Sequence, residues 1–229
     1  MEATMSADGA SGTWDYIGAL TGVAASVVLV VPIIDVAPPP PIFSGTTILD
    51  HYLRYRSEEL LSALLGGIGW LLFLWFLSSL RGWLKRAEGP EGRLANIAFA
   101  AGTTLVALAL VNNILPATLA FGASDADASI ALAFSNLTRM TVGFAALPAG
   151  AMLLAIALIS IRTTGVPRWL GAAAGIISAG TLVAIGGIFA TEGPLVPAGS
   201  YSCWLFSAFL LWLAITSFTV ARSARTSTR

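Results

Sequence analysis

Charged residues are scarce in this sequence. Only 10% of its 229 residues are Asp, Glu, Lys or Arg, whereas soluble domains carry about 25%. The apolar share is 56%, and the mean hydropathy is +0.82. This composition excludes a disordered chain, a nucleic-acid-binding protein and an ordinary soluble enzyme, because each of these needs a larger polar or charged share. It indicates an integral membrane protein.

Cysteine and histidine each occur once, as Cys203 and His51. One cysteine cannot form an internal disulfide framework, and one histidine cannot supply a zinc site with several His ligands. His51 lies outside the apolar runs, so a serine–histidine dyad does not fit within a membrane either. Every carboxylate lies at or beyond the end of a run, which excludes an intramembrane aspartyl protease, and HExxH, CxxC, Walker-type and GxGxxG motifs are absent. We therefore expect no catalytic residue, no cofactor and no metal site, and a protein that is not an enzyme.

The long uncharged runs predict the fold. About 20 apolar residues cross a hydrocarbon core of roughly 30 Å, and the runs do not alternate as the strands of a membrane β-barrel do. We expect an all-α, polytopic bundle of six transmembrane helices. The first 16 residues contain no Lys or Arg, so the first run is expected to be a retained helix and not a signal peptide. The predicted segments are a disordered tail at 1–15, spans at about 17–36, 60–80, 94–115, 140–161, 169–191 and 200–221 within a domain at 16–222, and a basic tail at 223–229.

The basic residues predict the orientation. Nine of the twelve Lys and Arg residues fall between spans 2 and 3, between spans 4 and 5, or after span 6. Lys and Arg accumulate in cytoplasmic loops, so these segments, and with six spans both termini, are expected to face the cytoplasm. The outer face would then carry two helical extensions. One begins at Thr46 or Thr47 and leads straight into span 2, and the other is the start of a helix at 128–161, which at about 51 Å exceeds the hydrocarbon thickness.

Several polar residues are expected at one depth near the outer ends of spans 2, 3 and 4. Arg139 is the one charge within a long apolar stretch, and such residues usually have a partner. Two interpretations apply: an ion pair of Arg139 with a carboxylate that fixes helix packing, or the lining of an outward-facing polar pocket for a headgroup or small ligand. The candidate residues of that pocket are Glu58, Glu59, Asn112, Asn113, Asn136 and Arg139.

Small residues and the cysteine are expected to serve packing. Gly18-x-x-x-Gly22 and Gly171-x-x-x-Gly175 each place two glycines on one helix face, where helix backbones can approach closely. Cys203, within the sixth apolar run, is expected to be an inert apolar-facing thiol.

Three segments resemble a known group of proteins. Arg81-Gly-Trp-Leu-Lys-Arg-Ala-Glu-Gly89, Gly92-Arg-Leu-Ala95 with the Gly/Ala/Leu span that follows, and Val166-Pro-Arg-Trp-Leu-Gly171 are similar to small multi-pass integral membrane proteins of actinobacteria, a family of unknown function. The resemblance covers roughly residues 15–222. It implies a six-helix bundle in a bacterial plasma membrane, and it implies no activity and no functional residue.

Three functional hypotheses follow. The leading one is a multi-pass, non-enzymatic protein that acts by association with the lipid bilayer, a membrane-protein partner or a second copy of itself, and not with nucleic acid. The second is a carrier or transporter of a small ligand or lipid that uses the outward polar pocket. The weakest is a lipid-modifying enzyme with His51 and Asp50 as its acid–base pair.

Overall fold

The computed structural model describes residues 16–31, 44–190 and 193–227. These residues form helices and no strands. After an N-terminal helix, Tyr16–Val31, come α2 (Gly45–Arg54), α3 (Arg56–Glu88), α4 (Arg93–Phe121), α5 (Ala128–Arg162), α6 (Arg168–Gly186), the 3₁₀ turn η1 (Gly187–Phe189) and α7 (Ser200–Ser227). The all-helical prediction is confirmed for this part of the chain.

Five of the described helices are long and apolar enough to cross a membrane: α3, α4, α5, α6 together with η1, and α7. The N-terminal helix is apolar but shorter. The predicted first span runs on to residue 36, beyond the described part of this helix, and the predicted tail at 1–15 also lies outside the described residues.

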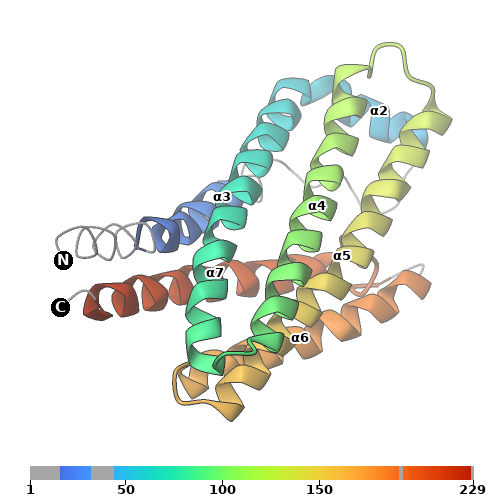
Figure 1. The fold of residues 1–229 in the computed structure, drawn as a ribbon. Coiled ribbons are helices and arrows are strands. Elements are labelled where there is room, and N and C mark those ends of the chain that lie inside the picture. Colours follow the sequence, from blue (N-terminus) through green and yellow to red (C-terminus); the bar gives the residue numbers. More distant parts are fainter. Residues whose placement is uncertain (1–15, 32–43, 191–192, 228–229) are drawn as a thin grey trace.

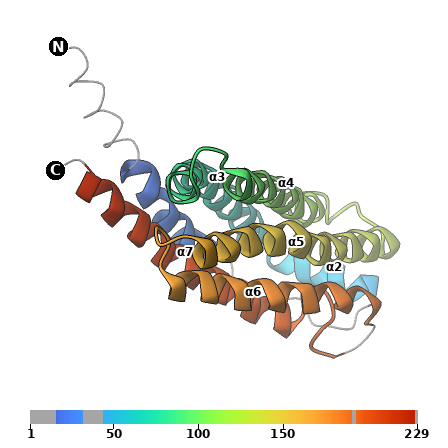
Figure 2. The same ribbon diagram turned by 60° about the horizontal axis from the view of Figure 1, so that its bottom comes forward.

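The long helices form two groups. Helices α3 to α6 follow one another as antiparallel neighbours, while α7 and the N-terminal helix run side by side and cross α3 obliquely (Figures 1 and 2). Aromatic side chains of α3 and α7 pack at this crossing, where the ring centroids of Phe73 and Phe209 lie 5.7 Å apart in an edge-to-face arrangement. The oblique crossing matters for the site, because helices that cross at an angle diverge away from their contact.

The turns between α3 and α4 and between α5 and α6 lie at the same end of the bundle (Figure 1). They approach each other closely, since a Cβ added at Gly165 would lie 2.7 Å from the Ala87 side chain. The α3–α4 turn is closed by Glu88, whose two carboxylate oxygens accept hydrogen bonds from the backbone N–H groups of Leu94 (2.9 Å) and Ala95 (2.8 Å). A carboxylate at the start of a helix satisfies free N–H groups and complements the helix dipole. We call this the basic end, because both turns are rich in Arg and Lys.

The glycine pairs bring helices together, as predicted. A Cβ at Gly22 would lie 2.7 Å from the Phe76 ring, so the N-terminal helix approaches α3 more closely than any side chain would allow. At Gly171 a Cβ would overlap the buried Ser160 side chain of α5, whereas at Gly175 it would lie at an ordinary 3.6 Å from the Ala157 Cβ.

Helix α2 lies at the opposite end, across the ends of α4 and α5 (Figure 1). Its N-cap is Ser44, whose hydroxyl accepts a hydrogen bond from the backbone N–H of Thr47 at 3.3 Å, so the helix begins slightly before the predicted start. The prediction of a continuous helix into span 2 was wrong: the backbone departs from helical geometry at Tyr55. The break allows Ile48 and Tyr52 to pack against Ala131 and other residues of α4 and α5.

Helix α5 continues unbroken for 35 residues through Pro148, or about 52 Å at 1.5 Å per residue. The predicted extension is confirmed, and it provides the surface on which α2 rests.

Candidate functional site

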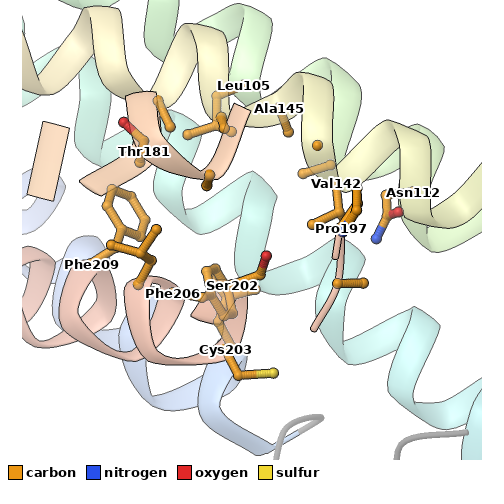
Figure 3. A pocket seen from close by; sticks show the side chains of 18 of the residues that line it. Leu105, Asn112, Val142, Ala145, Thr181, Pro197, Ser202, Cys203, Phe206 and Phe209 are labelled. Carbon is orange, nitrogen blue, oxygen red and sulfur yellow. The ribbon is translucent and has the colours of Figure 1, made fainter. Parts of the chain in front are cut away.

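A cavity of about 360 Å³ lies between α3, α4, α5, α6 and α7. The loop before α7 and the end of the N-terminal helix complete its wall (Figure 3). Volumes of about 300–1,000 Å³ are typical of small-molecule pockets. The wall is mainly apolar, and none of the described residues that line it is Asp, Glu, Lys, Arg or His. Its larger apolar side chains are Leu29, Trp70, Leu105, Val142, Leu153, Ile177, Leu205, Phe206 and Phe209.

Small residues leave this space open. Gly66 on α3, Ala109 on α4 and Gly143 on α5 face the cavity with no side chain or a single methyl group. Pro197 and Ala198 of the loop before α7 also line the cavity, and Ala198 has a left-handed conformation (φ 61°) that is uncommon for alanine. The cavity thus follows from both the diverging helices and the residues on their facing surfaces.

Asn112 and Asn113 line the cavity, and each has one side-chain polar atom that is covered by protein and has no hydrogen-bond partner among the described residues. These two atoms are Asn112 Oδ1, an acceptor, and Asn113 Nδ2, a donor. A buried polar atom without a partner costs about 1–3 kcal/mol, so two such atoms side by side in sequence call for an explanation. The other polar groups of the wall differ from them: Thr181, for example, donates from its hydroxyl to the Ser178 carbonyl at 2.7 Å.

Asn113 lies in a notch of the neighbouring helix. A Cβ added at Gly66 would lie 2.8 Å from its Nδ2 and 2.9 Å from its Oδ1, so the amide of Asn113 packs directly against the α3 backbone. Asn112 lies beside Pro197 at one end of the cavity, and Phe209 lies at the other end (Figure 3). The cavity therefore has one amide-bearing end and one aromatic end.

The structure divides the six predicted pocket residues. Asn112 and Asn113 line the cavity, while Glu58, Glu59, Asn136 and Arg139 are not part of its wall. Asn136 is exposed and Arg139 partly exposed, both on α5. Glu58 is exposed and accepts a hydrogen bond from the Ser57 hydroxyl at 3.1 Å.

Glu59 belongs to a second polar cluster, which lies between α2 and the start of α3. Its Oε1 lies 3.0 Å from His51 Nε2, and the two side chains are only 9% and 8% exposed. The His51 ring also contacts those of Tyr52 and Tyr55. Burial, and then the charge of Glu59, raise the pKa of the Tyr52 hydroxyl well above its ordinary value. Asp50, the expected acid–base partner of His51, is exposed on α2, and His51 itself is not part of the cavity wall.

Cys203 was expected to be an apolar-facing packing residue, but it is exposed at the edge of the cavity (Figure 3). The prediction failed because Cys203 stands near the start of α7, where this helix diverges from its neighbours. The single thiol of the chain is thus located where it can report on the contents of the cavity. Within the described residues, no three His, Cys, Asp or Glu side chains are grouped as metal ligands would be.

No protein-family model matches this chain, and neither a curated protein nor a solved structure shows detectable similarity to it. Functional inference therefore depends on the geometry of the chain itself.

Proposed function

We propose that this protein is a multi-pass protein of a bacterial plasma membrane that binds a lipid-like molecule in the cavity and does not alter it chemically. The observation that carries the proposal is the pair of buried, unpartnered amide atoms of Asn112 and Asn113 in an otherwise apolar wall. A ligand with an apolar body and a hydrogen-bonding group would pack against the apolar wall and, once the two amides rotate toward it, satisfy both atoms. The proposal joins lipid association, the leading hypothesis from the sequence, with the pocket of the second hypothesis.

The surface of the helices supports a membrane location. Large apolar side chains such as Ile114, Phe121, Ile176 and Leu211 are at least 60% exposed. Exposure of such an apolar surface to water is unfavourable, whereas contact with lipid tails is not. The apolar bundle is compatible with an integral membrane protein, and in that setting the molecules that can reach the cavity are predominantly lipids.

We also propose that the basic end faces the cytoplasm. The Arg and Lys residues of the α3–α4 and α5–α6 turns lie together at this end (Figure 1), as the positive-inside rule expects. Asn112 lies 19 residues beyond Arg93, or about 29 Å along α4, which is about the thickness of the hydrocarbon core. The amide-bearing end of the cavity would then lie near the outer headgroup region. A green fluorescent protein fused after Arg229 should fluoresce in cells, and an alkaline phosphatase fusion at the same position should be inactive; the reverse pattern would refute this orientation.

The binding proposal can be tested with Cys203 as the reporter. Purified, delipidated protein in amphipol is treated with a maleimide, with and without a total bacterial lipid extract. We expect the extract to slow labelling of Cys203 several-fold, because a bound molecule covers the thiol. Native mass spectrometry should then show one lipid per chain.

The double variant Asn112→Leu/Asn113→Leu should retain the lipid less well, since its wall offers no amide. The matched control is Asn136→Leu, which changes an exposed asparagine outside the cavity and should behave as wild type. Equal labelling rates with and without the extract would refute the proposal and would mean that water satisfies the amides.

A further inference from the structure

The polar atoms of the wall also indicate the class of ligand, if the proposed binding function is correct. Asn112 Oδ1 is an unpartnered acceptor and needs a donor, while Asn113 Nδ2 is an unpartnered donor and needs an acceptor. Both atoms are covered by protein, so each amide must rotate toward the cavity to reach a ligand, and a ligand that then satisfies both must donate and accept. Hydroxyl groups do both, whereas ester, ether and ketone oxygens only accept.

The charge of the wall narrows the class further. Among the described residues that line the cavity, the only ionisable side chain is the Cys203 thiol at its edge. A phosphate or carboxylate moved from water into such a wall would lose its hydration without gaining a cation, which is strongly unfavourable. The headgroups of anionic lipids are disfavoured for this reason.

The apolar part of the wall accounts for the rest of the ligand. Phe206 and Phe209 lie at the end of the cavity away from Asn112 (Figure 3), so the polar group of an amphiphile would lie at one end and its hydrocarbon at the other. We infer that the cavity binds an uncharged amphiphile with hydroxyl groups, such as a monoacylglycerol or a related lipid alcohol, with Asn112 accepting from and Asn113 donating to those hydroxyls.

Three synthetic probes with one alkyl chain test this inference. Dodecylglycerol is uncharged and has two hydroxyls, its di-O-methyl derivative has the same shape but only accepts, and dodecyl phosphate is charged. For each probe the concentration that halves the rate of Cys203 labelling is measured in amphipol. Each probe partitions into amphipol equally for all variants, so the ratio between variant and wild type isolates the contribution of the altered side chain.

The two asparagines should respond differently. Asn112→Leu should raise the half-protection concentration of dodecylglycerol by about 2- to 10-fold, as expected for one lost hydrogen bond, and should leave that of the dimethyl derivative unchanged. Asn113→Leu should raise both. Dodecyl phosphate should protect wild type less well than dodecylglycerol. The alanine variants of both positions provide a second set in case a leucine disturbs the fold, and Asn136→Leu is again the control.

The outcomes separate this inference from the proposed function. If all probes protect wild type equally and the variants change nothing, the cavity binds apolar chains and the hydroxyl assignment is wrong. If dodecyl phosphate protects best, the assignment of an uncharged ligand is wrong. If no probe protects Cys203 and the lipid extract does, the ligand belongs to another class; if the extract also fails, the proposed function falls with the inference.

Discussion

Two adjacent glycines of α3 allow a sharp test of the amide site. A Cβ at Gly66 would lie 2.8 Å from Asn113 Nδ2 and 2.9 Å from its Oδ1, whereas a Cβ at Gly67 would meet nothing within 4 Å. Distances below 3.0 Å are not tolerated, so in Gly66→Ala the Asn113 amide must move. In Gly67→Ala it need not. Both substitutions occur in the interior of the same helix, and both add one methyl group.

The effect on stability should be small and partly cancelling. An alanine in a helix interior gains up to about 1 kcal/mol over glycine, and this gain is common to both variants. A side chain forced about 30° from its rotamer costs about 0.5–1.5 kcal/mol, and only Gly66→Ala has this cost. We therefore expect Gly66→Ala to unfold at a lower temperature than Gly67→Ala, by an amount that corresponds to about 1 kcal/mol.

The effect on binding should be larger in relative terms. Loss of the Asn113 hydrogen bond corresponds to about 0.5–1.5 kcal/mol, or roughly 2- to 10-fold in the half-protection concentration of dodecylglycerol. Because Gly66 itself lines the cavity, its new methyl group could also act by occupying space. The combination Gly66→Ala/Asn113→Leu separates the two effects: if the methyl group acts through Asn113, the two substitutions will not be additive. Equal half-protection concentrations in Gly66→Ala and Gly67→Ala would refute the description of this notch.

Two further predictions concern stability. Gly171→Ala should lower the free energy of unfolding in detergent by about 1–3 kcal/mol because its methyl group overlaps the Ser160 side chain, while Gly175→Ala should be neutral or stabilising; equal effects would contradict the close approach of α5 and α6. Burial and the charge of Glu59 raise the pKa of Tyr52, so the folded state disfavours the ionised tyrosine. The stability that depends on neutral Tyr52 is therefore present below the ordinary tyrosine pKa of about 10. It is lost as the pH rises further. The unfolding temperature of wild type should therefore fall more steeply above about pH 10 than that of Tyr52→Phe. Parallel pH profiles of the two unfolding temperatures would show that Tyr52 is not buried as described.

The sequence predicts the helices well where hydrophobicity decides them. The long extension of α5 through Pro148 could be predicted because residues 128–161 contain no other proline, and a proline within an apolar helix need not end it. The break at Tyr55 could not be predicted, since residues 54–56 contain neither glycine nor proline. Long-range packing produces that break: α2 turns across the ends of α4 and α5 to bury Ile48 and Tyr52.

The site could be predicted only in part. The depth of a residue along a span can be counted from the sequence, but the sequence does not show which side of the helix faces the other helices. Depth alone predicts the same role for Glu58 and Glu59, yet Glu58 is exposed and Glu59 is buried against His51. The apolar wall contributed by α7, with Phe206 and Phe209, follows from the oblique crossing of helices that are distant in sequence. Neither the crossing nor the space it leaves has a local signal in the chain.

A third asparagine of α4 shows what makes the amide pair unusual. Asn96 lies on the same apolar helix, and its Oδ1 accepts hydrogen bonds from Arg81 Nε at 3.0 Å and Nη2 at 2.8 Å. Its role is accounted for within the protein, as it ties α4 to α3. Asn112 and Asn113 have the same side chain in a similarly apolar stretch, but each has a buried polar atom that nothing in the described chain satisfies. A buried amide atom in that state is unfavourable until another molecule supplies its partner, so the contrast with Asn96 supports the proposal that the cavity binds a ligand.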